Sequence, residues 1–309
     1  MITSGDLYRY LETTVNLHRE DVAEFRKQVN YLRSELDSRI RAYPSYALLT
    51  SRHFGSLAKG TAVAGLKEID VAILLRPGSI PASERGALLG VIRELLLPIY
   101  PNKDPGDFVV DEPAVTVSFR TSGRKVDVVP VISASGEWSS GFLAHRGGWL
   151  ETDVPRHLEI IRTWKVAHPT FIPLVRLTKW WRNERGVPLP SFVCELLWAH
   201  LMERGLVPRD DLVASLLGFF GYIERSGLKE MIVFPETSDP AVAMHGPVCV
   251  ADPVNPRNNA AGSMTVAERD ASVSAAGAAL DALAQASTAH TPTLSVGAMR
   301  KVFGSSFNP

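Results

Sequence analysis

The sequence predicts an α+β protein, with a mixed sheet and flanking helices followed by a helical domain. Strand-like apolar runs alternate with helical patterns up to about residue 155, and helical patterns dominate from about Leu158 onward. Hydrophobic residues form 45% of the 309 residues and charged residues 21%, as in an ordinary globular protein. This length allows two domains, which we expect at residues 1–155 and 156–309.

The first domain should open with a long helix. Apolar residues recur every three or four positions over residues 17–41, with charged residues between them. We expect this helix to pack on both domains. Strands are expected at residues 46–54, 69–75, 116–119 and 125–131, the last two joined by a turn at 121–123. Residues 82–97 form a helical pattern bounded by two prolines.

The second domain should consist mainly of helices. Helical patterns cover residues 155–167, 174–185, 192–204, 210–226 and 267–286. Residues 235–262 are rich in proline, asparagine and glycine, which predicts an irregular but ordered loop.

Charge, cysteine content and apolar run length argue against a nucleic-acid-binding, secreted or membrane protein. The chain has 33 Lys and Arg against 33 Asp and Glu, so no net positive charge attracts a long nucleic acid. Cys194 and Cys249 lie in apolar runs, which predicts two buried free thiols in a reducing compartment. No apolar run approaches the roughly 20 residues of a membrane span, and no signal peptide is visible. We expect a cytoplasmic protein without membrane contact.

The chemistry is concentrated around two strands. A strand ends at Gly55-Ser56, and a tight turn there would direct backbone N–H groups and a hydroxyl toward a phosphate. Glu68 and Asp70 follow on a buried strand, where residues two apart face the same side and Ile69 points into the core.

A third carboxylate, Asp127, lies on another apolar strand. Strands placed side by side would bring it to Glu68 and Asp70, and three carboxylates can hold two Mg²⁺ ions about 3.5–4 Å apart. Carboxylates within apolar strands cost free energy unless they are paired or bind metal. The alternative is that these are three unrelated charges on strand edges.

These motifs resemble a known family. The runs GSLAKGT, EIDVAILL and KVDVVPV resemble the nucleotidyltransferase fold of the polymerase-beta superfamily. Residues 149–157, with Pro155 one position late, and the runs LVRLTKWW, LPSFVCELL and ADPVNPRNN are similar to segments of the cGAS/DncV-like nucleotidyltransferases, or CD-NTases. The resemblance covers most of residues 50–307 and implies a bilobed cage in which the helical domain closes the nucleotide pocket.

The resemblance also implies residue roles. The metal and catalytic residues would be Glu68, Asp70 and Asp127, with Asp127 helping to activate the attacking ribose hydroxyl. The nucleotide-binding residues would be Gly55, Ser56, Lys59, Thr61, Lys179, Ser191 and Phe192. Simpler alternatives exist, since Lys179 suits a solvated helix face, Ser191 a helix N-cap and Phe192 the core. Lys59 could equally point away from the nucleotide.

The implied function is the condensation of NTPs into a cyclic di- or trinucleotide, with release of pyrophosphate, in bacterial anti-phage (CBASS-type) signalling. Two Mg²⁺ ions would serve as cofactors, and Mn²⁺ could replace them. The product would act on a downstream effector, and an activating partner protein is possible. Two alternatives remain: an RNA nucleotidyltransferase resembling CCA-adding enzymes, against which the neutral charge argues, and a catalytically silent nucleotide-binding protein.

Overall fold

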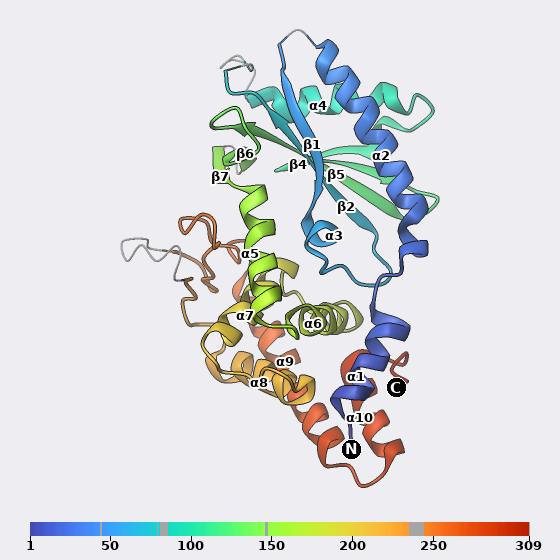
Figure 1. Ribbon diagram of the computed structural model, residues 1–309, viewed down its shortest axis with the longest axis vertical. Coiled ribbons are helices and arrows are strands. Elements are labelled where there is room, and N and C mark those ends of the chain that lie inside the picture. Colours follow the sequence, from blue (N-terminus) through green and yellow to red (C-terminus); the bar gives the residue numbers. More distant parts are fainter. Residues whose placement is uncertain (44, 79, 81–85, 146–147, 235–243, 309) are drawn as a thin grey trace. The chain divides into compact units, whose positions relative to one another are not determined.

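The computed structural model describes residues 1–308, apart from residues 44, 79, 81–85, 146–147 and 235–243. The chain forms two compact units (Figure 1). Residues 17–159 form the first, here called the sheet unit, and residues 1–16 with 160–309 form the second, the helical unit. The α+β fold class is confirmed.

One sheet organises the sheet unit. Its order is β1-β2-β5-β4-β3, and β6 joins through β5 and carries β7 at its outer side. Strands β2 and β5 are parallel, and the other strand pairs are antiparallel. The strands in the described residues are β1 Leu48–Phe54, β2 Glu68–Leu75, β3 Phe108–Asp111, β4 Ala114–Phe119, β5 Arg124–Ser133, β6 Gly141–His145 and β7 Gly148–Thr152.

Two helices cover one face of this sheet. Helix α2 (Arg19–Ala42) confirms the predicted opening helix, and α4 (Leu88–Leu96) is the described part of the helix predicted over 82–97. The apolar residues of both helices pack on every second residue of β2, namely Ile69, Val71, Ile73 and Leu75. This period of two leaves Glu68 and Asp70 on the opposite face.

Among the described residues, the helical unit contains the helices that the sequence predicts and three further elements, α1, η1 and α10. Its helices are α1 Ser4–Tyr10, η1 Leu11–Val15, α5 Val154–Ala167, α6 Phe171–Arg185, α7 Ser191–Glu203, α8 Leu212–Ser226, α9 Val266–Thr288 and α10 Pro292–Phe303. Helix α5 begins within the sheet unit and continues into the helical unit.

The N-terminal residues group differently from the expectation. Residues 1–16 are expected in the first domain but group with the helical unit. Tyr10 accounts for this: it is fully buried, its ring lies 4.8 Å from that of Phe307, and its hydroxyl donates to the Phe303 carbonyl at 3.2 Å. This hydrogen bond joins positions 293 residues apart, which local sequence patterns do not reveal.

Three smaller expectations concern the cysteines, membrane spans and the loop at 235–262. Both cysteines are free, and Cys194 is buried as expected, whereas Cys249 is only half-buried. Among the helices of the described residues, none has the length and apolar composition needed to cross a bilayer. Of the predicted loop at 235–262, residues 244–262 are described and form no helix, and residues 235–243 lie outside the described part of the chain.

Candidate functional site

Three carboxylates meet on the central strand pair of the sheet unit. In the parallel pairing of β2 with β5, Asp70 is directly opposite Asp127 and Glu68 is opposite Lys125. One carboxylate oxygen from each of Glu68, Asp70 and Asp127 lies within 4.8 Å of the other two. The expected cluster is therefore present as a geometric arrangement.

The cluster has an unfavourable electrostatic balance by itself. Burial raises the pKa of Glu68 to about 7, and the neighbouring charges of Asp127 and Asp70 act in the same direction, while Lys125 opposes them. Like charges at this distance disfavour the ionised form of each other. A bound divalent cation would remove this repulsion, and three carboxylates match the hard oxygen donors that Mg²⁺ and Mn²⁺ accept. The donor set therefore fits such an ion.

A threonine that the sequence analysis did not single out holds one of these carboxylates. Thr116 on β4 faces Asp127 across the antiparallel pair, and its hydroxyl donates to Asp127 Oδ1 at 2.7 Å. This bond restricts the Asp127 side chain. The observed hairpin pairs Phe119 with Arg124, so its loop is one residue longer than the predicted turn at 121–123, and this register places Thr116 opposite Asp127.

The expected phosphate-binding turn is a short helix, α3 (Gly55–Lys59), which lies directly after β1. Gly55 has a φ of 65°, and a Cβ on it would overlap Oδ2 of the Asp70 carboxylate. Glycine is therefore required for two reasons, the backbone conformation and the close approach to a carboxylate.

The neighbouring residues close this turn. The Thr61 amide donates to the Ser56 carbonyl at 2.9 Å, and the Thr61 side chain is buried. Ser56 and Lys59 are half-buried on the same short helix. The structure thus places Gly55 at the carboxylate cluster, and Ser56, Lys59 and Thr61 on the turn that begins there.

Lys179, Ser191 and Phe192 lie in the helical unit. Lys179 on α6 is only 3% exposed, and its ammonium group donates to Glu195 Oε1 on α7 at 2.6 Å. Lys179 is thus not a solvated helix charge. Ser191 is the first residue of α7, whose N-cap is Pro190, so Ser191 is not the N-cap. Ser191 and Phe192 are both half-buried.

The chain is similar to bacterial cyclic-nucleotide synthases. It is 38% identical to the cyclic AMP-AMP-AMP synthase of Escherichia coli (strain MS 115-1), over 97% of this chain and 96% of that protein. It is 32% identical to the CBASS oligonucleotide cyclase CdnC of Escherichia coli (strain KTE188), over 87% of each chain. No profile of a known protein family matches.

Solved structures agree with these sequence relatives. The structure of Escherichia coli MS115-1 CdnC with ATP has a TM-score of 0.83 and 35% identity, covering 100% of this chain and 99% of that chain. The same protein in complex with HORMA-deltaN gives a TM-score of 0.83 and 36% identity, with the same coverage.

The close approach of Gly55 to Asp70 gives a matched pair of variants. Gly55→Ala should displace the Asp70 carboxylate and abolish Mn²⁺ binding, as measured by electron paramagnetic resonance. Gly65→Ala is the control, because Gly65 has a similar φ of 72° and no atom lies within 4 Å of the place that the added methyl group would occupy. Both variants lose about 1 kcal/mol to the left-handed backbone. Equal Mn²⁺ binding by the two variants would contradict the proposed steric role.

The Lys179–Glu195 pair gives a second prediction. Lys179→Met should destabilise the protein by about 3 kcal/mol, because it leaves a buried carboxylate without this ammonium group. The double variant Lys179→Met/Glu195→Leu should recover most of the loss, since it removes both charges. Urea unfolding followed by circular dichroism measures both effects. If Lys179→Met were as stable as the wild type, the loss of the ammonium group would not destabilise the protein, and the prediction would be wrong.

Proposed function

The chain belongs to the CD-NTase family of bacterial cyclic-oligonucleotide synthases, and we propose that it joins ATP into cyclic oligoadenylate, with a trinucleotide as the main product. The observation that carries the catalytic part is the register that brings Asp70 beside Asp127, with Glu68 on the same face. The relative named cyclic AMP-AMP-AMP synthase supports the choice of product, because it aligns over 97% of this chain at 38% identity. We place the activity in CBASS-type anti-phage signalling.

In this proposal the three carboxylates form the metal site, and the turn after β1 binds the triphosphate. Glu68, Asp70 and Asp127 hold two Mg²⁺ ions, which when bound stabilise the attacking and leaving oxygens of an in-line displacement. The Thr116 hydroxyl holds Oδ1 of Asp127, and the Asp127 carboxylate would help to activate the attacking ribose hydroxyl. The backbone of Gly55 and the hydroxyl of Ser56 bind the triphosphate, and Thr61 supports this turn.

The reaction repeats one step. A ribose hydroxyl of one nucleotide attacks the α-phosphorus of another, a new P–O bond forms, and the bond to the β-phosphate breaks. Pyrophosphate leaves with the electron pair of the broken P–O bond. The proton of the attacking hydroxyl passes to the Asp127 carboxylate, which acts as the general base. A final intramolecular transfer closes the ring. Most of the catalytic advantage comes from orientation and charge stabilisation, because the residues need only hold the reacting groups in line.

The helical unit supplies further contacts in the proposal. Lys179 contacts the outer phosphates, with Glu195 fixing its ammonium group, while Ser191 binds phosphate and Phe192 stacks on a base. Lys59 contributes from the α3 turn. We also propose that a HORMA-type protein binds this chain and activates it, because the E. coli CdnC of 36% identity forms a complex with such a protein.

Product analysis tests this function. The purified protein, with and without a HORMA-type partner, is incubated with ATP or all four NTPs and Mg²⁺ or Mn²⁺. A phosphatase-resistant mass of three AMP units, each less one water, is the expected product. Asp127→Asn should reduce it below detection, whereas Asp111→Asn, which changes an exposed carboxylate on strand β3, should leave it unchanged. Incorporation into a tRNA lacking its 3′ end would instead indicate an RNA nucleotidyltransferase.

The repulsion within the carboxylate cluster gives a separate test of the metal. Without divalent ions, Asp127→Asn should raise the Tm by about 2 °C or more, because it removes one like charge and keeps an acceptor for Thr116. Mg²⁺ should raise the Tm of the wild type more than that of the variant. Differential scanning calorimetry measures both shifts, with Asp111→Asn as control. An equal effect of Mg²⁺ on all three proteins would argue against a metal site at Asp127.

A further inference from the structure

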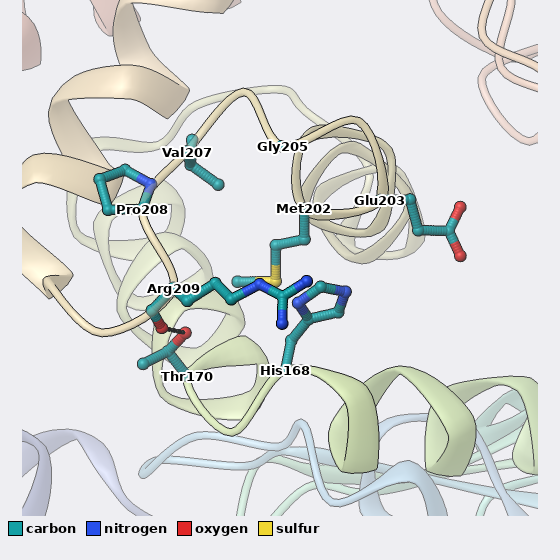
Figure 2. Close-up of a pocket in the computed structure, with 8 residues that line it drawn as sticks. All are labelled: His168, Thr170, Met202, Glu203, Gly205, Val207, Pro208 and Arg209. Atoms are coloured by element: carbon teal, nitrogen blue, oxygen red, sulfur yellow. Dashed lines mark hydrogen bonds between the residues drawn. The ribbon is translucent and has the colours of Figure 1, made fainter.

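A pocket of about 300 Å³ lies within the helical unit, apart from every residue assigned above. It is formed by the turn between α5 and α6, with His168 and Thr170, and by the end of α7 and the loop that follows it (Figure 2). This volume is at the lower end of the range for small-molecule sites in proteins. The pocket is large enough for a small organic ligand.

Two basic side chains point into this pocket. Figure 2 shows the Arg209 guanidinium lying beside the His168 ring in the middle of the lining residues. His168 is only 7% exposed, and burial together with the charge of Arg209 lowers its pKa. The ring is therefore neutral near pH 7 and offers one N–H donor, next to the several donors of the guanidinium.

Neither basic group has an acidic partner in the part of the chain that is described. No hydrogen bond or ion pair joins the side chain of His168 or Arg209 to another described residue. Glu203 also lines the pocket, but its Oε1 accepts from the Trp164 indole at 2.6 Å, and its carboxylate points away from Arg209 (Figure 2). The pocket thus presents a positive charge and free donors.

The backbone around these two residues is held in place. The Thr170 hydroxyl donates to the carbonyl of Arg209 at 2.7 Å and ties the loop to the α5–α6 turn (Figure 2). The Phe171 amide donates to the His168 carbonyl at 2.9 Å within that turn. A site whose segments are already connected loses little conformational entropy when a ligand binds.

The remaining wall is apolar and suits the organic part of a ligand. Met202, Val207 and Pro208 face the pocket beside the basic pair (Figure 2). A guanidinium pairs with a carboxylate or phosphate through two parallel hydrogen bonds, whereas apolar side chains favour a carbon skeleton. We propose that this pocket binds a small organic oxyanion, a carboxylate or a phosphate monoester on an apolar body, through Arg209 and His168.

Isothermal titration with three probes tests this site. Benzoate represents the carboxylate source and phenyl phosphate the phosphate source, with inorganic phosphate as the probe without an apolar body. Arg209→Gln should weaken binding by about tenfold or more, because a charge-assisted hydrogen bond is lost. Arg209→Lys keeps the charge but not the paired geometry, so its affinity should lie between those of the wild type and Arg209→Gln. Arg209 is exposed at its outer side, so these variants should fold.

Two controls separate this site from others. Arg162→Gln changes an exposed arginine of α5 that does not line the pocket, and it should bind like the wild type. Asp127→Asn should also bind like the wild type, which separates the pocket from the carboxylate cluster and keeps this test independent of the proposed synthase activity. The proposal is wrong if neither organic probe binds the wild type at ~10 mM, a concentration that detects even millimolar affinity. It is equally wrong if Arg209→Gln binds both as the wild type does.

Discussion

The repulsion between three carboxylates, opposed by one parallel strand pair, is the interaction on which the site depends. Asp70 and Asp127 are adjacent only because β2 and β5 pair in that register. A shift of one residue would turn each side chain to the opposite face. The register is fixed by Ile69 and Val71 on β2 and by the alternating valines of β5, which are buried beneath α2 and α4. The apolar face of the sheet thus supplies the free energy that holds like charges together.

Close approach imposes a second constraint on the same strands. The turn after β1 passes so near to Asp70 that only a residue without a Cβ fits at Gly55. On the neighbouring strand β4, the Thr116 hydroxyl donates to Asp127 and restricts the orientation of its carboxylate. Both contacts restrict a carboxylate without neutralising it. The carboxylates are therefore held in position in the protein itself, which is what a cation site needs before the cation arrives.

The central elements could be predicted from the sequence because their signals are local. Nearly continuous apolar runs defined β2 and β5, and a period near 3.6 defined α2. The short strands β3, β6 and β7 were missed because four or five residues give too short an apolar pattern. Two contacts join different segments of the chain: Tyr10 is buried against Phe303, and Lys179 pairs with Glu195. A periodic sequence pattern does not predict such contacts. The contact between Thr116 and Asp127 depends on a hairpin loop one residue longer than the predicted turn, so the turn prediction alone did not reveal it.

The buried pair on α6 and α7 bears on the role of Lys179. Its two side chains are 4% and 2% exposed, so both charges carry a large desolvation penalty. Such pairs stabilise a protein little compared with apolar residues of similar size, although the loss of one partner is strongly destabilising. Stability alone therefore does not account for placing a lysine there. The proposed contact of Lys179 with nucleotide phosphates would give a functional reason for the lysine.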